Sequence, residues 1–454
     1  MAQKPRIAKG TRDFSPEEVA KRDYIFSTIK KQFELFGFQP IETPSFELSE
    51  TLMGKYGDEG DRLIFKILNS GDYLRGVELN KNNAFSLTSK ISEKALRYDL
   101  TVPFARYVVQ HQNDITFPFK RYQIQPVWRA DRPQKGRFRE FFQCDADVVG
   151  SSSLWQEVEF VQLYDAVFAD LGLYGTTIKI NHRKILSGLA EVIDAQDKLI
   201  DFTVALDKLD KIGKDKVIEE MLAKGISAES ISKIDPIFSI TGSFEEQLGA
   251  LEAILINSVV GLEGIAQLRF LNEQLSQFAL KSSTLQLELT LARGLNYYTG
   301  TIFEVAAPDG VKMGSIGGGG RYDDLTGVFG LKGIGGVGIS FGLDRIYLVL
   351  EELNLFSKTI TNSIDVLFVN FGDQEAAYAM RAINELRANN VVAELYPDNA
   401  KFKKQFGYAD KRSIPYVVIV GEEELINNTY TLKNMKSGDQ EKISLKDLIE
   451  KVKA

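Results

Sequence analysis

The sequence predicts an α+β protein built from several domains, because stretches of different character follow one another along the chain. Short apolar runs typical of β-strands dominate residues 62–150, helical periodicity follows over about 185–280, and strands alternate with helices from about residue 363. The chain has 454 residues. That is too long for one ordinary core, since domains hold roughly 100 to 200 residues each.

The first part of the chain predicts one long helix followed by strands. Apolar residues recur at helical spacing over 17–37, and Gly37 supplies a C-terminal stop. Pro40 and Pro44 then bracket an extended segment that can serve only as an edge or irregular strand. Further strand-like runs are RLIFKIL, AFSLTS, KRYQIQPVWRA and REFFQCDADVVG. Residues 154–171 predict another amphipathic helix, and TTIKIN a strand.

The later part of the chain is predicted to change from helices back to strands. The helical segment after residue 185 has the composition of an inserted domain, and LQLELTLARGLNYYTGTIFEVAAP then returns to strand-like alternation. A glycine-dense tract runs from Gly314 to Gly342. Beyond it, strands at 364–370, 391–396 and 416–420 alternate with helices at 375–389 and 400–411 and a closing helix. This alternation favours a small α/β domain with a largely parallel sheet.

Composition and charge exclude several classes of function. The chain is 44% hydrophobic and 26% charged, and no apolar run approaches the roughly 20 residues of a membrane span. Its first residues lack the apolar segment of a secretory signal, so we expect a cytoplasmic protein without membrane contact. A net charge of −7 argues against a protein that coats nucleic acid indiscriminately.

Cysteine and histidine are scarce. The single cysteine, Cys144, excludes an intrachain disulfide and any metal site built from several thiolates. The only histidines, His111 and His182, have no nucleophile or second ligand at useful spacing, so we expect structural or surface roles for both. The chemistry must therefore use Arg, Asp, Glu, Tyr, Gln and the backbone, which favours phosphate or nucleotide chemistry over covalent hydrolysis.

The segment from Trp128 to Asp147 predicts a β-hairpin with a strongly basic tip. Arg129, at the stem, has the fork geometry that donates two hydrogen bonds to a phosphate. Phe141 is suited to stack on a base, and Gln143 and Asp147 to receive a polar ligand deeper in. On spacing alone, an exposed hairpin with a solvated tip is the simpler explanation.

Three other segments are candidates for a site, and each has a plain structural explanation as well. In ALRYDLTVPFARY, Asp99 reads as the N-cap of a helix. In LARGLNYYTGTIFE, a buried arginine with two core tyrosines explains the pattern without a ligand. The tract SIGGGGRYDDL, continuing to GGVGISFGLDRIYLVL, lets backbone approach a ligand closely. It is neither a P-loop nor a dinucleotide-binding fingerprint, so alone it is weak evidence.

Taken together, these segments resemble class II aminoacyl-tRNA synthetases of the histidyl type. RADRPQKGRFREFFQCDAD is similar to motif 2 in its histidyl form, FRxERPQxGRxRxFxQ, with Trp128 and Asp131 in place of the usual Phe and Glu. LARGLNYYTGTIFE resembles the histidine-specific RGLDYYxxTxFE signature, with Asn296 in place of Asp. ALRYDLTVPFAR matches the family's LRYDLTVPFAR, and the glycine tract resembles motif 3.

This resemblance implies a fold and a reaction. The fold is a class II catalytic domain with an antiparallel sheet and helices, interrupted by an α-helical insertion and followed by an α/β anticodon-binding domain. We place the catalytic core at 1–185 and 282–355, the insertion at 186–281 and the anticodon-binding domain at 363–454. The reaction joins L-histidine to tRNA(His) through histidyl-adenylate, releasing AMP and pyrophosphate. Mg²⁺ accompanies the ATP, with no dedicated protein metal site.

The resemblance also implies site residues. Arg129 and Arg293 are the implied catalytic residues. The implied histidine-binding residues are Asp99, Leu100, Thr101, Arg129, Gln143, Asp147, Arg293, Tyr297 and Tyr298. The implied ATP-binding residues are Arg129, Asp131, Arg137, Phe141 and Arg345. By family likeness Arg129 holds the α-phosphate and the substrate carboxylate, Arg137 the γ-phosphate and Phe141 the adenine. An enclosure that pairs an imidazole and an ammonium rejects ligands that leave its polar groups bare.

Two further features of the family concern partners. Motif 1 is the loosest match, a helix ending at Gly37 and a strand containing Pro44, and it implies a homodimer. The segment KFKKQFGYADKRSIPYVVIVGEEEL resembles the anticodon-binding domain. Its positive charge is concentrated at Lys401, Lys403, Lys404, Lys411 and Arg412, a stripe suited to RNA backbone, although a solvated helix face is the alternative. We expect the hairpin tip to contact the tRNA acceptor end and Cys144 to pack in the core.

Three rival interpretations remain at this point. The first is the catalytically silent regulatory paralogue of these synthetases that serves histidine biosynthesis and lacks the anticodon domain. The second is a class II synthetase for another amino acid, against which the RGLNYY stretch counts. The third is a glycine-rich nucleotide-binding enzyme such as a dehydrogenase, which lacks support because the required strand-glycine-helix order is missing.

Overall fold

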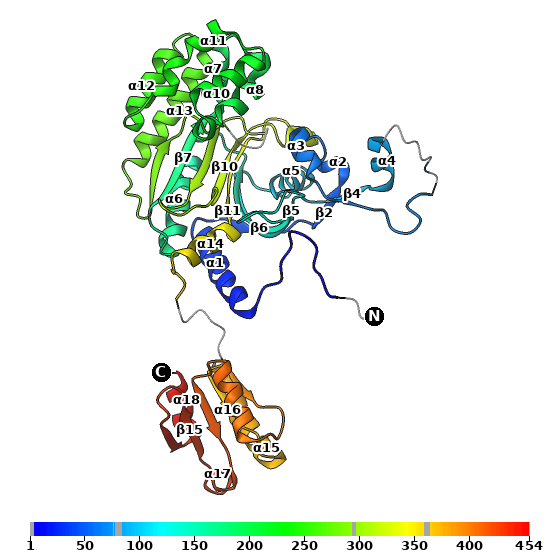
Figure 1. The fold of residues 1–454 in the computed structure, drawn as a ribbon, viewed down its shortest axis with the longest axis vertical. Coiled ribbons are helices and arrows are strands. Elements are labelled where there is room, and N and C mark those ends of the chain that lie inside the picture. Colours follow the sequence, from blue (N-terminus) through cyan, green and yellow to red (C-terminus); the bar gives the residue numbers. More distant parts are fainter. Residues whose placement is uncertain (1–3, 76, 78–83, 293–296, 358–363, 454) are drawn as a thin grey trace. The chain divides into compact units, whose positions relative to one another are not determined.

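The computed structural model describes residues 4–75, 77, 84–292, 297–357 and 364–453. The chain divides into two compact units, Met1–Ser357 and Lys358–Ala454. Each unit is described by itself below (Figure 1). Within the described residues, no helix is both long enough and apolar enough to cross a membrane.

An eight-stranded sheet forms the centre of the first unit, in the order β1-β5-β6-β11-β10-β9-β7-β8. Its strands are β1 (Gln39–Pro40), β5 (Phe119–Trp128), β6 (Glu140–Val149), β7 (Thr176–His182), β8 (Ser283–Leu287), β9 (Thr301–Ala306), β10 (Gly317–Tyr322) and β11 (Gly336–Gly342). All neighbours pair antiparallel except the outermost pairs, β1 with β5 and β7 with β8. This confirms the predicted antiparallel sheet. The strand that contains Pro40 lies at the sheet edge, as proline requires.

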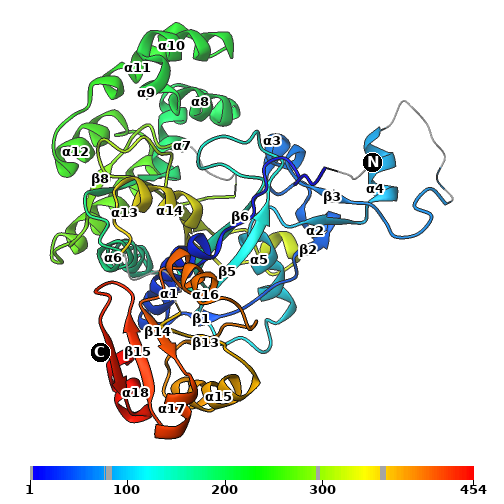
Figure 2. The same cartoon turned by 60° about the horizontal axis from the view of Figure 1, so that its bottom comes forward.

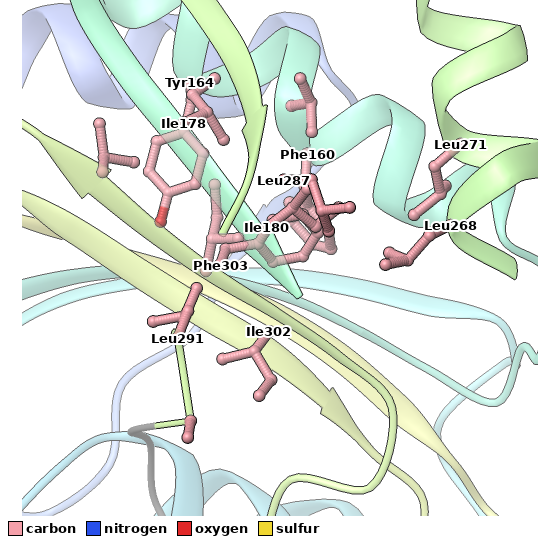
Figure 3. Packing of buried hydrophobic residues seen from close by; sticks show 14 of the residues in the cluster. Phe160, Tyr164, Ile178, Ile180, Leu268, Leu271, Leu287, Leu291, Ile302 and Phe303 are labelled. Atoms are coloured by element: carbon pink, nitrogen blue, oxygen red, sulfur yellow. The ribbon is translucent and has the colours of Figure 1, made fainter. Parts of the chain in front are cut away.

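Helix α1 (Pro16–Leu35) packs against α6 (Trp155–Asp170) and α14 (Leu343–Glu352). Helices α6 and α14 pack on β11, and α14 also on β6. Helix α1 begins where the sequence predicts, because Ser15 and Glu18 form a reciprocal capping box and Pro16 occupies the first turn. The core beneath these helices is aromatic, with Phe341 ringed by Phe33, Tyr164 and Phe168. Figure 3 shows its continuation, where Phe160 and Tyr164 meet Ile178, Ile180 and Phe303 of the sheet.

A small three-stranded sheet stands beside the main one, in the order β2-β4-β3. It contains β2 (Phe46–Leu48), β3 (Lys66–Ile67) and β4 (Lys94–Leu96), with helices α2 (Ser49–Leu52), α3 (Gly57–Arg62), α4 (Ala84–Ile91) and α5 (Thr101–Gln110) nearby. Two predictions were wrong here. AFSLTS lies in helix α4, and only two residues of RLIFKIL form a strand. Apolar runs this short do not distinguish a helix from a strand.

Helices make up the described regular structure between β7 and β8, as predicted for the insertion. They are α7 (Arg183–Val192), α8 (Leu199–Leu206), α9 (Leu209–Ile212), α10 (Lys214–Ala223), α11 (Ala228–Lys233), α12 (Phe244–Ile254) and α13 (Val259–Leu275), with short 3-10 turns between them. Figures 1 and 2 show α8, α10, α11 and α12 gathered in one cluster to one side of the sheet. Helices α7 and α13 approach closely at two glycines, since a Cβ on Gly188 would lie 2.7 Å from the Cα of Gly261. The insertion's exact boundaries stay a prediction.

His182 is fully buried at the end of β7. Its Nδ1 accepts a hydrogen bond from the backbone N–H of Lys184 and so caps helix α7, while Nε2 pairs with Gln267. Burial lowers the pKa of His182 to about 4. His111 stands at the C-terminal end of α5. Both histidines therefore have the structural or surface positions that we expected.

The second unit has a five-stranded sheet in the order β13-β12-β14-β15-β16. Its elements are β12 (Val366–Phe368), α15 (Asp373–Ala388), β13 (Ala393–Leu395), α16 (Phe402–Lys411), β14 (Tyr416–Ile419), α17 (Glu422–Asn427), β15 (Tyr430–Asn434), β16 (Gln440–Ile443) and α18 (Leu445–Lys453). The predicted largely parallel sheet needs correction: β12 pairs parallel with β13 and β14, but β14, β15 and β16 pair antiparallel. The final hairpin gave no strand signal because β16 is almost wholly exposed and polar.

Candidate active site

Two adjoining cavities lie over the middle of the eight-stranded sheet. The larger has a volume of about 350 Å³ and the smaller about 40 Å³. The residues lining both are Gln143, Tyr298, Gly318, Gly319 and Ser340. They come from β6, β10 and β11 and from the segment before β9. The glycines leave space above this part of the sheet, because a strand residue without a side chain leaves room for a ligand.

The smaller cavity is acidic on the side formed by β6. Gln143, Asp145 and Asp147 alternate along this strand and therefore project from the same face of the sheet. Gly338 on the neighbouring strand makes room for them, since a Cβ there would lie 2.0 Å from Oδ1 of Asp147. Cys144, between them, is fully buried on the other face, in the aromatic core beneath α1 and α6, as predicted.

Asp99 adds a third carboxylate from the segment before helix α5. It accepts hydrogen bonds from the hydroxyls of Tyr56 at 2.8 Å and Tyr297 at 3.2 Å, and from the backbone N–H of Val102. Leu100, not Asp99, occupies the N-cap position, so the predicted N-cap is one residue off although Asp99 still accepts the helix N–H. Burial raises the pKa of Asp99, while these donors oppose the rise.

Arg121 is a buried cation that the sequence interpretation missed. It stands directly across from Asp147 in the β5–β6 ladder, and its Nη2 lies 2.7 Å from Oδ2 of Asp147. Tyr322 donates a 2.6 Å hydrogen bond to Oδ1 of the same carboxylate. The hairpin register could have indicated this pair, because a hairpin that pairs Trp128 with Glu140 also pairs Arg121 with Asp147.

Asp145 was missed as well, although the alternation in QCDAD places it beside Gln143 and Asp147. Gln143 donates to its Oδ1 at 3.3 Å. Burial, together with the negative charge of Asp147, raises the pKa of Asp145 to about 7, against the opposing charge of Arg121. Three carboxylates thus face the smaller cavity, and the guanidinium of Arg121 lies fully buried beside Asp147.

The larger cavity is lined by three guanidinium groups, those of Arg129, Arg137 and Arg345, and by the carboxylates of Asp131, Glu304 and Asp344. All five residues predicted to bind ATP, namely Arg129, Asp131, Arg137, Phe141 and Arg345, line it. Burial, with the charges of Arg137 and Arg129, holds the pKa of Arg345 below its ordinary value. Arg137 pairs with Asp131 at 3.7 Å, and the planar forks of the three guanidinium groups suit phosphate oxygens.

Arg129 lines the larger cavity beside Gln143, which lines both cavities. Its Nε donates to the carbonyl of Tyr98 at 3.0 Å, and its Nη2 reaches Oε1 of Gln143 at 3.5 Å. The guanidinium lies over the rings of Tyr98 and Phe141. A ligand group bridging the two cavities would therefore meet a fixed positive charge at the junction.

Arg345, in the first turn of α14, ties two walls of the larger cavity together. Its Nε donates to the carbonyl of Gly136 at 2.9 Å and its Nη1 to that of Ser315 at 2.5 Å. The loop that follows β5 is accordingly anchored. Its basic residues are not uniformly solvated: Lys135 pairs with Glu352 at 3.0 Å, and Arg139 donates to the carbonyl of Asp131.

The remaining predicted residues are placed as follows. Thr101, Tyr297 and Tyr298 line the smaller cavity, and the two tyrosine rings meet edge to face at 5.0 Å. Leu100 lines neither cavity, and its side chain is fully buried. Arg293 and Asn296 lie outside the described residues. Within the described part of the chain, no cluster of three or more His, Cys, Asp or Glu is arranged to hold a metal ion.

Known proteins resemble this chain along its whole length. Residues 73–346 match the family described as Histidyl-tRNA synthetase, and residues 364–454 match the Anticodon binding domain. A histidine--tRNA ligase of Christiangramia forsetii is 69% identical over 451 residues, and one of Flavobacterium johnsoniae is 63% identical over 469, each alignment covering 99% of both chains. The crystal structure of histidyl-tRNA synthetase from Nostoc sp. PCC 7120 has a TM-score of 0.81 at 31% identity, covering 100% of this chain and 99% of that one.

The raised pKa of Asp145 predicts a pH-dependent stability. The unfolded carboxyl titrates near its ordinary value of 3.8 and the folded one near about 7, so between these values the folded state binds more protons. Ionisation therefore removes stability as the pH rises. Asp145→Asn does not ionise, so its Tm relative to the wild type should increase from about pH 4 to about pH 7 and then level off. A Tm difference that is constant with pH would contradict this assignment.

Proposed function

Because the chain belongs to the histidyl-tRNA synthetase family, we propose that its two cavities divide the small substrates of one reaction between them. The protein charges tRNA(His) with histidine in an ATP-dependent reaction. Family membership decides against a synthetase for another amino acid and against a dehydrogenase. The match over residues 364–454 covers the domain that the regulatory paralogue lacks.

Histidine is assigned to the smaller cavity and the wall that it shares with the larger one. Asp99 and Gln143 supply acceptors for the ammonium group, and Asp147, fixed by Arg121 and Tyr322, supplies an acceptor for an imidazole N–H. Thr101, Tyr297 and Tyr298 complete the enclosure. The observation that carries this assignment is the row of acidic side chains on β6, because a buried carboxylate needs a donor and histidine brings several. Leu100 and Arg293 keep their predicted roles on family likeness alone.

ATP is assigned to the larger cavity. Arg129 meets the α-phosphate and the histidine carboxylate, Arg137 and Arg345 the γ-phosphate, and Phe141 the adenine ring, with Asp131 near its edge. Mg²⁺ enters with ATP, held mainly by phosphates and water. The carboxylate of Glu304 on the cavity wall is an oxygen donor of the kind that this ion prefers.

The geometry favours direct transfer without a covalent enzyme intermediate. A carboxylate oxygen of histidine attacks the α-phosphorus, and pyrophosphate leaves toward Arg137 and Arg345. Arg129, fixed by the carbonyl of Tyr98, offsets the negative charge that grows at the junction. The terminal ribose hydroxyl of the tRNA then attacks the histidyl carbonyl, and AMP leaves. Positioning and charge stabilisation account for both steps, so no side chain needs to act as a nucleophile.

Recognition of tRNA is assigned to helix α16 of the second unit. Lys401, Lys403, Lys404, Lys411 and Arg412 lie on or beside this helix and are exposed, while Gln405 and Ala409 face the interior. Arg412 also pairs with Glu394 at 2.9 Å. Exposed cations on one helix suit the RNA backbone. A homodimer and a cytoplasmic location belong to the same proposal, on family likeness alone.

Exchange of pyrophosphate into ATP tests the substrate assignment. Among the standard amino acids, histidine alone should support exchange. Asp99→Asn should raise the KM for histidine by about tenfold or more, because a charge-assisted hydrogen bond to the ammonium group is lost. Arg129→Ala should lower kcat by about 10² or more. Exchange that proceeds equally well with another amino acid, or that Arg129→Ala leaves intact, would refute the assignment.

The salt dependence of tRNA binding tests the role of α16. Lys403→Ala should weaken binding and reduce the slope of log affinity against log salt by about 1, because one phosphate contact is removed. Lys446→Ala is the matched control, since Lys446 is equally a surface lysine, on α18. Pyrophosphate exchange should be unaffected in both variants. Identical salt slopes for the two variants would contradict the proposed RNA contact.

A further inference from the structure

The N-terminal segment, residues 9–14, lies against the return of the loop that joins β5 to β6. The backbone N–H of Arg139 donates to the carbonyl of Gly10 at 2.8 Å, and its Nη1 reaches the carbonyl of Lys9 at 3.4 Å. Gly10 has a φ of +88°, and a Cβ there would lie 2.8 Å from Cγ of Arg139. The close contact therefore depends on a glycine.

Two arginines from this end of the chain converge on one carboxylate oxygen. Nη2 of Arg12 and Nη1 of Arg22 each lie 2.5 Å from Oδ1 of Asp344. The Arg12 guanidinium also lies over the ring of Phe138, 3.4 Å from its centroid, and faces Phe14 at 4.7 Å. Arg12 thus joins α14, which contains Asp344, to the loop, which contains Phe138.

The same two segments are joined inside the cavity by Arg345. Asp344 immediately precedes Arg345 in α14, and Gly136, the acceptor of the Arg345 Nε hydrogen bond, lies two residues before Phe138. Asp344, Arg345, Gly136 and Phe138 all line the larger cavity, whereas Arg12 does not. Arg12 lies outside the cavity and contacts Asp344, next to Arg345, and Phe138, near Gly136. It therefore supports both partners of the hydrogen bond between Arg345 and Gly136.

A purely structural ion pair does not account for Arg12. Arg22, on α1, is more deeply buried than Arg12 and already supplies Asp344 with a counter-charge. A second guanidinium on the same oxygen adds repulsion, and burial with the charge of Arg22 keeps the pKa of Arg12 below its ordinary value despite Asp344. Of the two arginines, only Arg12 contacts Phe138 of the loop.

We propose that Arg12 is a positioning residue for ATP: by holding Asp344 and Phe138 together, it fixes Arg345 and the loop around the triphosphate. The proposal rests on the assignment of ATP to the larger cavity. Without Arg12, the loop loses its outer support, and Arg345 and Arg137 no longer present their guanidinium groups in fixed positions. Histidine, held by β6 and Asp99, is bound independently of this contact.

Exchange kinetics separate this role from a structural one. Arg12→Ala should raise the KM for ATP by about tenfold, since small displacements of positioning groups have large effects, and should change the KM for histidine by less than about twofold. Arg12→Lys should restore part of the ATP affinity, because a lysine pairs with Asp344 but lacks the planar fork. Gly10→Ala, which displaces the segment without removing a charge, should give the same selective rise.

Arg269→Ala is the matched control. Arg269 bridges Glu245 and Glu252 on the insertion, and its side chain is 29% exposed against 26% for Arg12. It should leave both KM values unchanged. A lower Tm for Arg12→Ala with an unchanged KM for ATP would overturn the positioning role while leaving the proposed function intact. A wild type without histidine-dependent exchange would overturn both.

Discussion

The close approach of β6 and β11 is the constraint on which the site depends. Gly338 leaves the space that the Asp147 carboxylate occupies, and a Cβ on Gly319 would lie 2.2 Å from the carbonyl of Gly338. Strands β6, β11 and β10 can therefore lie close together, with the acidic side chains of β6 over the glycines of the neighbouring strands. Any other residue at position 338 would push Asp147 out of its contacts with Arg121 and Tyr322. Gly319 and Gly338 are thus explained by close packing around a polar pocket.

The carboxylates of β6 and the guanidinium groups of the site lie at different ends. The β6 face brings carboxylates together, while the loop after β5 and helix α14 bring Arg137 and Arg345 to the other end. Arg129 lies between them, held by the carbonyl of Tyr98 and by two aromatic rings. In the proposed assignment, the ammonium group of histidine is attracted to the carboxylates and the triphosphate to the guanidinium groups. Their reacting groups meet beside a cation that is already in place.

Sequence reasoning found what lies within a continuous motif and missed what folding assembles. The five residues predicted to bind ATP line one cavity, and they could be named because the hairpin and the first turn of α14 each contain a continuous segment that resembles a family motif. Arg121 gave no local signal, because its partner Asp147 is 26 positions away and is met only across the ladder. Arg12 was missed for a similar reason, since its pairing with Asp344 spans 332 positions. The antiparallel β15–β16 hairpin was missed because its outer strand is polar and exposed.

Calorimetric titration of histidine and ATP into Gly338→Ala tests the central claim most directly. The account predicts that histidine affinity falls by about tenfold or more, because the added methyl group displaces Asp147, while ATP affinity changes by less than about twofold. Gly327→Ala is the control, since a Cβ at Gly327 would come no closer than 3.8 Å to a neighbour. Unchanged histidine affinity in Gly338→Ala, with ATP binding intact, would contradict the claim that the space beside Asp147 forms the histidine pocket.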